Sequence, residues 1–581
     1  MSVNADASAP WVSTYPTASE VLGYEISLGE RAKLWAGVPL DQALVLIANM
    51  LKDHDLGLTN SRAVDAGWVR EVQDDGLKAS LTKAVASGQH LIAPQLLLLA
   101  ATEALEFCSP GPASNTLEGL DEVLMAVLGI GDEAGSPEPV GESWATLDLG
   151  LASELIANGH FNQTADPIHL MAWTNENWRS AWPAGVPNSA VKKAGGQPGE
   201  LFREATGIEI DEFISVAVHL WAQAGQRGTL RFPSEFFDQL GVDRPAVELF
   251  LAATSGSVDE LRTTAKVERD DSNGSQWAFH AMRRHPLVCL DDGSWLVLRL
   301  GFLIERTLSD TTFWDVRNYL KSQDEARGTN RFDRFDAFMN CIEAAFESQV
   351  AESLKRMFPA LAGHSRVFTE RDMQHAWKKK GGLPSVCDFA VDCGPIWLLF
   401  DATNRRITES TINATADGAH LDVELNRTLT DKKARQFAAT ARLLRNERRK
   451  LTDRDALDET WYVPIVVTPA GGLGWSPPVS IRSDEILAEA GVLQGARMHR
   501  LAIMTIRDLR ALESAMEQGQ AADKLLVEWR TGSHGLAFDQ FIGQKPGVIL
   551  SRPRWEGKVA SSVMDMIIAR SKMVEKIDAG T

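Results

Sequence analysis

The alternation of apolar and polar residues is clearest in the segment 385–406, SVCDFAVDCGPIWLLFDATNRR. Residues 386–391 alternate and are rich in β-prone side chains, which predicts a strand. The tetrapeptide Asp392-Cys393-Gly394-Pro395 predicts a tight turn, and the almost wholly apolar residues 396–400 predict a second strand that is buried on both faces. The pattern therefore predicts a buried β-hairpin, and we expect the rest of its domain to be organised around it.

Two acidic residues interrupt this hairpin: Asp388 within the first strand and Asp401 where the second strand ends. Burial of a carboxylate among apolar side chains is unfavourable unless another group pairs with it. A divalent cation would be a suitable partner, and oxygen ligands of this kind suit Mg²⁺ or Mn²⁺. The alternative is that hydrogen bonds satisfy Asp388 and that Asp401 only caps the end of its strand.

Helical periodicity dominates the chain before this hairpin. Residues 36–200 predict an α-helical domain and residues 201–284 a helical connecting region. Residues 1–35 contain Ser, Thr, Pro and Ala without a clear period, so we expect them to be loosely ordered. This half of the chain has no P-loop, Rossmann glycine fingerprint, HExxH motif or GxSxG elbow, and it therefore offers no chemistry of its own.

A long amphipathic helix is predicted over residues 332–358, which carry a continuous apolar stripe. Glu343 and Glu347 lie one turn apart on the border of this stripe, and we expect Glu343 to be solvated. Residues 285–298 predict another hairpin with an Asp-Gly turn. Residues 461–467 predict a further core strand.

Two shorter patterns concern helices after the hairpin. Lys433 precedes Phe437 by one helical turn, so it borders the apolar face that must pack on the sheet. A lysine in such a place either extends its amine to solvent or has a functional role. Thr505 is a suitable N-cap for a helix over residues 506–516.

The composition is that of a globular protein with an uneven charge distribution. Hydrophobic residues make up 44% and charged residues 24% of the chain. No signal peptide or membrane span is predicted, and the five cysteines form no CxxC pair, so we expect a cytoplasmic protein with reduced thiols. Residues 1–150 hold 21 acidic and 7 basic side chains, which favours a protein partner for this half.

The net charge of −19 argues against nucleic acid as a partner, but one segment has the opposite sign. Residues 426–455 hold 10 basic and 4 acidic side chains. The commoner explanation of such a run is a solvated helix face, and the alternative is contact with phosphate groups.

An acid in one strand and a second acid at the end of the next strand resemble the PD-(D/E)xK nuclease superfamily. In that superfamily a lysine follows the second acid by two residues, whereas this chain has Asp401-Ala402-Thr403. The resemblance extends to the FE pair Phe346-Glu347 and to the K-x-x-Q pattern Lys433-Ala434-Arg435-Gln436. It covers about residues 285–545, including the 285–298 hairpin.

This resemblance implies an α/β C-terminal domain with a restriction-endonuclease-like αβββαβ core. A mostly α-helical N-terminal region would precede this domain, and a C-terminal helix over residues 546–581 would follow it. The implied activity is metal-dependent hydrolysis of phosphodiester bonds in nucleic acid, with DNA as the expected substrate and phage defence or restriction as the setting.

The resemblance also assigns candidate residues. Asp388, Asp401 and the carbonyl of Ala402 would bind Mg²⁺ (or Mn²⁺), and Glu347 would reach toward the metal. Lys433 would supply the positive charge that is missing at Thr403, because the position of this lysine migrates within the superfamily, and Gln436 would orient one of these groups. The expected contacts to nucleic acid are Arg405, Arg406, Lys432, Arg435 and Arg442.

Three hypotheses follow for the function of the chain. The first is an active metal-dependent nuclease. The second is a nuclease fold that has lost catalysis and serves as a nucleic-acid-binding or scaffolding subunit, which the Asp401-Ala402-Thr403 triplet favours. The third is a helical interaction protein without a nucleic-acid role, in which the acids of the hairpin are structural.

Overall fold

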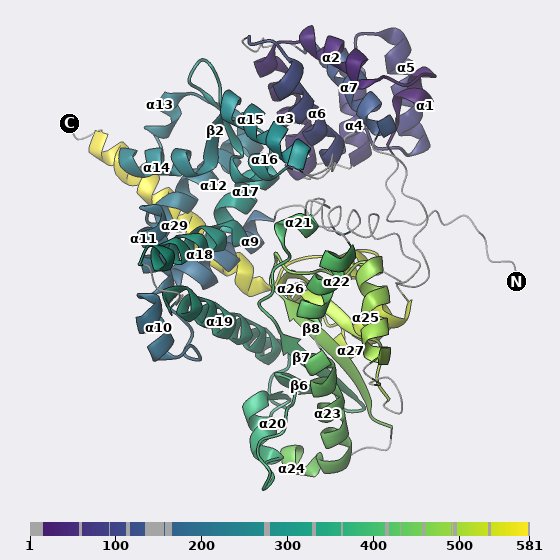
Figure 1. Cartoon of the computed structure of the whole chain (residues 1–581), viewed down its shortest axis with the longest axis vertical. Coiled ribbons are helices and arrows are strands. Elements are labelled where there is room, and N and C mark those ends of the chain that lie inside the picture. The colour runs from purple at the N-terminus through teal and green to yellow at the C-terminus, as the bar shows by residue number, and fades with distance from the viewer. Residues whose placement is uncertain are drawn as a thin grey trace, which may run out of the picture.

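The chain folds into a body of helices and an α/β domain, which share one long helix (Figure 1). The computed structural model describes residues 15–56, 61–91, 93–111, 117–133, 156, 166–271, 279–327, 333–361, 364–412, 418–429, 431–455, 459–489, 491, 497–532 and 536–578. The description below concerns these residues. A mostly helical chain with mixed sheets agrees with the expected combination of an N-terminal helical region and an α/β domain.

The helical body contains the N-terminal helices and the helices that lead to the α/β domain. Its first helices are α1 (Ala18–Leu22), α2 (Leu28–Ala36), α3 (Leu40–Leu56), α4 (Ser61–Glu71), α5 (Asp75–Ser87), α6 (Pro94–Phe107) and α7 (Leu120–Glu133). Further along the chain are α9 (Pro167–Thr174), the π-helical turn η2 (Asn175–Arg179), α10 (Asn188–Ala194), α11 (Pro198–Thr206), α12 (Ile210–Arg227), α13 (Ser234–Phe237), α14 (Arg244–Thr254), α15 (Val258–Asp271), α16 (His280–Arg284), α17 (Leu300–Leu308), α18 (Asp310–Ala326) and α19 (Asp333–Met357).

Residues 15–35 differ from the loose order expected of them, because they include α1 and most of α2. The side chain of Glu30 accepts hydrogen bonds from the backbone and hydroxyl of Ser27 and so fixes the start of α2. The indole of Trp35 is fully buried and joins the core. These helices are short, so their apolar residues are too few to produce a recognisable period.

A small mixed sheet lies within the helical body. Its strands are β1 (Arg231–Phe232), β2 (Ser255–Ser257), β3 (Leu287–Cys289) and β4 (Trp295–Val297), in the order β1-β4-β3-β2. Strands β3 and β4 form the antiparallel hairpin predicted over residues 285–298. Gly293 in its turn has a φ of 78°, a conformation that favours glycine.

The α/β domain is built on a second mixed sheet. Its strands are β5 (Val367–Thr369), β6 (Phe389–Asp392), β7 (Ile396–Ala402), β8 (Trp461–Thr468) and β9 (Ala502–Thr505), and they lie in sequence order. Strands β5, β6 and β7 are antiparallel, whereas β8 and β9 add parallel to β7. The hairpin predicted around residues 392–395 is thus confirmed as β6–β7, and the strand predicted over 461–467 as β8. The first strand of the hairpin begins at Phe389 and not at residue 386, so Asp388 lies just before β6 and not within it.

Helices pack around this sheet. They are α20 (Glu370–Ala376), α21 (Glu409–Ile412), α22 (Gly418–Thr428), α23 (Asp431–Glu447), α24 (Arg449–Thr452), α25 (Pro477–Glu489), α26 (Ile506–Glu517), α27 (Ala522–Gly532) and α28 (Phe538–Gly543). The hydroxyl of Thr505 accepts a hydrogen bond from the backbone of Asp508, so the predicted N-cap of α26 is confirmed.

Helix α19 belongs to two hydrophobic cores. Its first half, up to Ala345, packs in the core of the helical body, and its second half, from Phe346, packs in the core of the α/β domain. The boundary between the two cores therefore lies within one continuous helix. The hairpin β3–β4 packs in the core of the helical body. A 25-residue helix is about 37 Å long, which is enough to span both units.

The final helix, α29 (Arg554–Asp578), returns to the helical body, as Figure 1 shows by its yellow ribbon beside α9 and α18. Ala560, Val563 and Ile567 join the first core. Within the described part of the chain, no helix is both long enough and apolar enough to cross a membrane.

A buried network of charges joins α29 to both units. Glu556 is fully buried and contacts His169 of α9 at 3.0 Å and Arg510 of α26 at 3.0 Å. Arg510 is 2% exposed and also pairs with Glu176 of η2. The network thus connects the helical body, the α/β domain and α29 through one arginine.

We expect the substitution Glu556→Ala to lower the free energy of unfolding by about 3–5 kcal/mol, because it leaves Arg510 buried with an incomplete set of partners. Urea denaturation at pH 7 measures this change. The matched control is Glu352→Ala, whose exposed ion pair with Lys355 is worth at most about 1 kcal/mol. An equal, small effect of both substitutions would contradict the structural role of Glu556.

Candidate functional site

The two hairpin acids come together at the end of the β6–β7 ladder. Phe389 and Phe400 are the last pair of this ladder, Asp401 follows Phe400 in β7, and Asp388 lies just before β6. A 2.7 Å hydrogen bond from the backbone N–H of Ala402 to the side chain of Asp388 brings this carboxylate next to Asp401. Two carboxylates so close together are unfavourable in their ionised forms unless a positive charge lies beside them.

Asp388 is held by two backbone contacts. Its carbonyl accepts a 2.6 Å hydrogen bond from the backbone N–H of Glu370, the first residue of α20. Its side chain accepts a 2.7 Å hydrogen bond from the backbone N–H of Ala402. These contacts fix the carboxylate at the point where β7 ends.

Asp401 forms an ion pair with Lys433 of α23. Asp401 is 3% exposed, and the side chain of Lys433 is 13% exposed. Helix α23 packs its apolar face on the core through Ala434, Phe437, Ala441 and Leu444, all of them buried. Lys433 borders this face, as its spacing from Phe437 predicts, and its amine turns to a carboxylate instead of solvent.

Two polar contacts hold α23 against the segment before β6. The side-chain amide of Gln436 donates a 2.9 Å hydrogen bond to the carbonyl of Val386. The hydroxyl of Thr440 accepts a 3.0 Å hydrogen bond from the backbone N–H of Cys387. Gln436 therefore holds α23 against the residues that precede Asp388.

Glu347 of α19 lies near enough to the hairpin for its charge to interact with Asp388 and Asp401. Burial of the carboxylate raises the pKa of Glu347, and the negative charges of Glu343, Glu370 and Asp401 add to this shift. The residue as a whole is exposed, so water screens part of the repulsion.

Glu370 is a member of the site that the sequence did not single out. Burial and the charge of Asp401 raise the pKa of its carboxyl, whereas Lys432 opposes the shift. We call Glu347, Glu370, Asp388 and Asp401 the acidic cluster. The signal for Glu370 was the capping box between Thr369 and Asp372, which marks the start of α20 but not its place beside β6.

Within the acidic cluster, the largest pKa shift falls on Asp388. Burial raises the pKa of Asp388 to about 8, and the charges of Asp401 and Glu347 add to the effect. The hydrogen bond from Ala402 and the charge of Lys433 oppose it. A carboxyl group that retains its proton near neutral pH is typical of a functional site, although buried ion pairs produce the same effect.

The donor set fits a particular type of metal. No three His, Cys, Asp or Glu side chains within the described residues are arranged to hold an ion. Mg²⁺ is commonly bound by one or two carboxylates and retains several waters, so Asp388 and Asp401 fit it by donor type. The peptide of Ala402 lies between the two, since its N–H contacts Asp388.

The basic residues expected to contact nucleic acid occupy two kinds of position. Arg405 is exposed after β7, and Lys432, Arg435 and Arg442 are exposed on α23. The guanidinium of Arg406 instead lies 3.7 Å from the centroid of the Phe313 ring in α18. Arg406 thus contributes to packing between the α/β domain and the helical body.

Thr403 follows Asp401 by two residues at the end of β7. The residue is 7% exposed, and its backbone N–H donates a 2.9 Å hydrogen bond to the carbonyl of Val467 in β8. Its hydroxyl carries no charge, and the positive charge beside Asp401 is that of Lys433.

Comparison of the chain with protein-family models, with curated proteins and with solved structures gives no match.

We expect Asp388→Asn to become more stable relative to wild type as the pH rises. The folded protein retains the Asp388 proton up to a pH of about 8, whereas the unfolded chain releases it near pH 4. Between these values the folded state binds more protons, so the free energy of unfolding of wild type falls with rising pH. The asparagine side chain of the variant has no such proton and can still accept the hydrogen bond from Ala402.

The difference in the free energy of unfolding between the variant and wild type should shift by roughly 1–4 kcal/mol in favour of the variant between pH 5 and pH 9. Urea denaturation across this pH range measures it. Parallel pH profiles would show that Asp388 is ionised in the folded protein at all these pH values.

Proposed function

We propose that this chain hydrolyses phosphodiester bonds of nucleic acid, with DNA as the expected substrate and Mg²⁺ or Mn²⁺ as the cofactor. The observation that carries the proposal is the ion pair between Lys433 and Asp401, next to Asp388. A cation from α23 takes the place of the lysine that is missing at Thr403. The proposal thus accounts for the one departure from the superfamily motif.

The order of elements supports the same proposal. Helix α19 precedes β5, β6 and β7, and α23 and β8 follow them. If the shorter helices α20, α21 and α22 are set aside, this order resembles the αβββαβ core that the resemblance implies, with Asp401 on β7 and Asp388 just before β6. A role in restriction or phage defence is the setting that the resemblance implies.

The chemistry divides among the residues of the site. Asp388 and Asp401 would hold the ion, which supplies charge neutralisation at the phosphate and activation of the attacking water. Lys433 positions positive charge for the phosphate and pairs with Asp401. Gln436 and Thr440 hold α23 so that Lys433 stays at the end of β7. Glu347 and Glu370 border the site as further acceptors.

Exposed cations on α23 are a suitable surface for the phosphate backbone. Lys432, Arg435, Arg442 and Arg445 are exposed along the helix that carries Lys433. Nucleic acid that binds along this face would have a phosphate near the site, and phosphate contacts make binding strongly dependent on salt.

A second candidate is a subunit that binds nucleic acid without cutting it. Two observations favour it: Lys433 already satisfies Asp401, and no three potential metal ligands are arranged together in the described residues. In this case Lys433 is a structural counter-ion for a buried acid.

We expect wild type to cleave plasmid or linear DNA with Mg²⁺ or Mn²⁺, and Asp388→Ala, Asp401→Ala and Lys433→Ala each to reduce the rate by at least about a hundredfold. The matched control is Lys355→Ala, an exposed lysine whose partner is Glu352, and it should retain the full rate. In the Lys433→Ala background, Thr403→Lys tests whether a lysine in the motif position restores part of the rate.

If wild type cuts nothing, titration with Mn²⁺ by calorimetry separates the two candidates. Binding that requires both Asp388 and Asp401 supports a metal site, whereas no binding contradicts the nuclease proposal and leaves the nucleic-acid-binding subunit.

Both candidates require contact between α23 and phosphate, which has its own test. We expect Arg435→Ala, Arg442→Ala and Arg445→Ala, combined, to reduce the slope of log K against log salt by about 0.9 for each lost phosphate contact. Fluorescence anisotropy with labelled duplex DNA between about 50 and 200 mM salt measures the slope, a range over which such contacts are strongly screened. An unchanged slope would exclude this face as the contact surface.

A further inference from the structure

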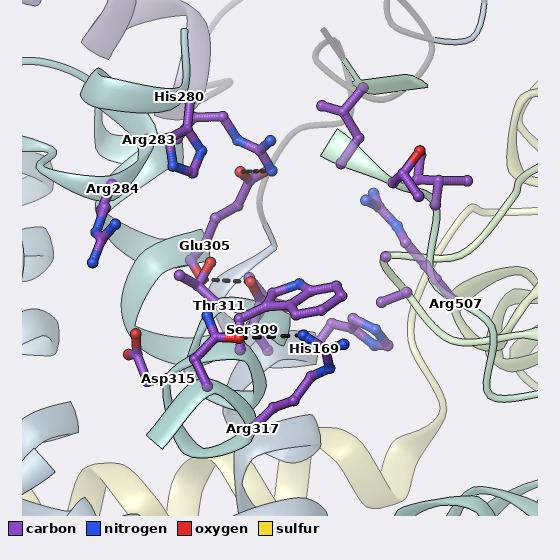
Figure 2. Close-up of a pocket in the computed structure, with 18 of the residues that line it drawn as sticks. His169, His280, Arg283, Arg284, Glu305, Ser309, Thr311, Asp315, Arg317 and Arg507 are labelled. Carbon is purple, nitrogen blue, oxygen red and sulfur yellow. Dashed lines mark hydrogen bonds and ion pairs between the residues drawn. The ribbon is translucent and has the colours of Figure 1, made fainter. Parts of the chain in front are cut away.

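A cavity of about 520 Å³ lies between the helical body and the α/β domain, away from the acidic cluster. Its walls come from α9, α16, α17 and α18 on one side, and from the loops after β7 and β8 and the start of α26 on the other. Figure 2 shows labelled side chains from both units around it. The volume is within the usual range of small-molecule sites, about 300–1,000 Å³.

Each acidic residue of the cavity wall already has an arginine partner. Asp315 contacts Arg306 at 2.7 Å, and Glu305 contacts Arg283 at 3.7 Å. Asp166 pairs with Arg552. The negative charges of the wall are therefore compensated by these pairs.

Three further arginines line the same wall. Arg284, Arg317 and Arg507 border the cavity, together with His169 and His280. In Figure 2, Arg507 extends from the α/β side toward the cavity, and Arg317 lies on the opposite, helical side. Burial lowers the pKa of Arg317, and the nearby charge of Arg406 adds to this shift. An anion in the cavity would offset this repulsion between guanidinium groups.

His169 adds a buried polar group to the wall. It is 4% exposed, and its Nδ1 contacts the carboxylate of Glu556 at 3.0 Å. Its other ring nitrogen, Nε2, is buried without a hydrogen-bond partner among the described residues. A buried polar atom of this kind is unfavourable unless a partner forms a hydrogen bond with it.

The cavity also offers surfaces for a planar ring. The indole of Trp314 lines it, and the guanidinium of Arg317 lies 4.9 Å from the indole centroid. Leu170, Ile407 and Ile412 add apolar contacts. An aromatic side chain next to arginines is a combination that recognises a base and a phosphate in one ligand.

We propose that this cavity binds a nucleoside triphosphate, with the phosphates on the arginines and the base against Trp314. The ligand would contact both units at once, through Arg317 and Arg284 on the helical side and Arg507 on the α/β side. This site is separate from the proposed phosphodiester chemistry, because none of Glu347, Asp388, Asp401, Lys433 and Gln436 lines the cavity.

Isothermal titration of the whole protein with ATP, GTP, CTP and UTP in turn tests the proposal. We expect at least one of them to bind at one site per chain. Arg317→Ala and Arg284→Ala should each weaken this binding about tenfold through the loss of charge-assisted hydrogen bonds, and Trp314→Leu about tenfold through the loss of stacking. Arg203→Ala on α11, an exposed arginine paired with Glu209, should bind as wild type does.

Two further measurements are the binding of fragments of the nucleotide to wild type and the binding of the complete nucleotide to a variant of the acidic cluster. Inorganic triphosphate and adenosine should each bind more weakly than the complete nucleotide. Asp401→Ala should retain nucleotide binding even where it loses cleavage, so failure of one proposal is distinguishable from failure of the other. Arg284 is exposed, so its substitution does not disturb the packing around Trp314.

Two results would overturn the proposal. One is that none of the four nucleotides binds. The other is that one binds with the same affinity to wild type, Arg317→Ala and Arg284→Ala. If inorganic triphosphate binds as tightly as the nucleotide and Trp314→Leu has no effect, the site takes a bare anion and the assignment of a nucleotide is wrong.

Discussion

Two carboxyl groups lie close together at the end of an apolar hairpin, one just before β6 and one on β7, and the ion pair between Asp401 and Lys433 places a positive charge beside them. The hydrogen bond from the backbone of Ala402 holds Asp388 at this place. A positive charge must therefore lie beside these acids. Lys433 of α23 provides it, and the hydrogen bonds of Gln436 and Thr440 fix the position of α23 relative to the hairpin.

The positive charge beside Asp401 need not come from the strand that carries this residue. A residue at position 403 shares the face of Asp401 through the two-residue period of the strand, whereas Lys433 reaches the carboxylate from the layer above. A cation at position 403 and a cation at position 433 would both lie beside Asp401, although they belong to different elements of the fold. The stability of the buried acids depends on where the positive charge lies in space and not on which residue of the sequence carries it.

The sequence predicted the elements with a long or strict hydrophobic pattern. Helix α19, the β6–β7 hairpin, strand β8 and the cap at Thr505 follow from periodicity and from the chemistry of turns and caps. Strand β5 and helices α1 and α2 are too short to show a period. They are determined by tertiary contacts, such as the burial of Trp35 in the first core.

Site residues were predictable where the residue type alone indicated their chemistry. Asp388, Asp401 and Lys433 meet as a charged group. By contrast, Glu370 enters the cluster through a backbone hydrogen bond to Asp388, and Arg406 turns to Phe313 in another unit. Neither contact has a sequence signal, because the partners are distant in the chain. The cavity between the units is hidden for the same reason, since its walls come from residues between 166 and 507.

The return of α29 to the helical body has a consequence for synthesis on the ribosome. Ala560, Val563 and Ile567 complete a core whose other members end at Ala345, so about 200 residues separate the two parts. At typical elongation rates of about 5–20 residues per second, the helical body waits roughly 10–40 s for its last helix. The α/β domain leaves the ribosome during this interval with its own core complete. Chaperones would therefore meet a nascent chain in which the domain made later folds first, and the apolar side chains of the helical body that α29 covers are the surface they would need to protect.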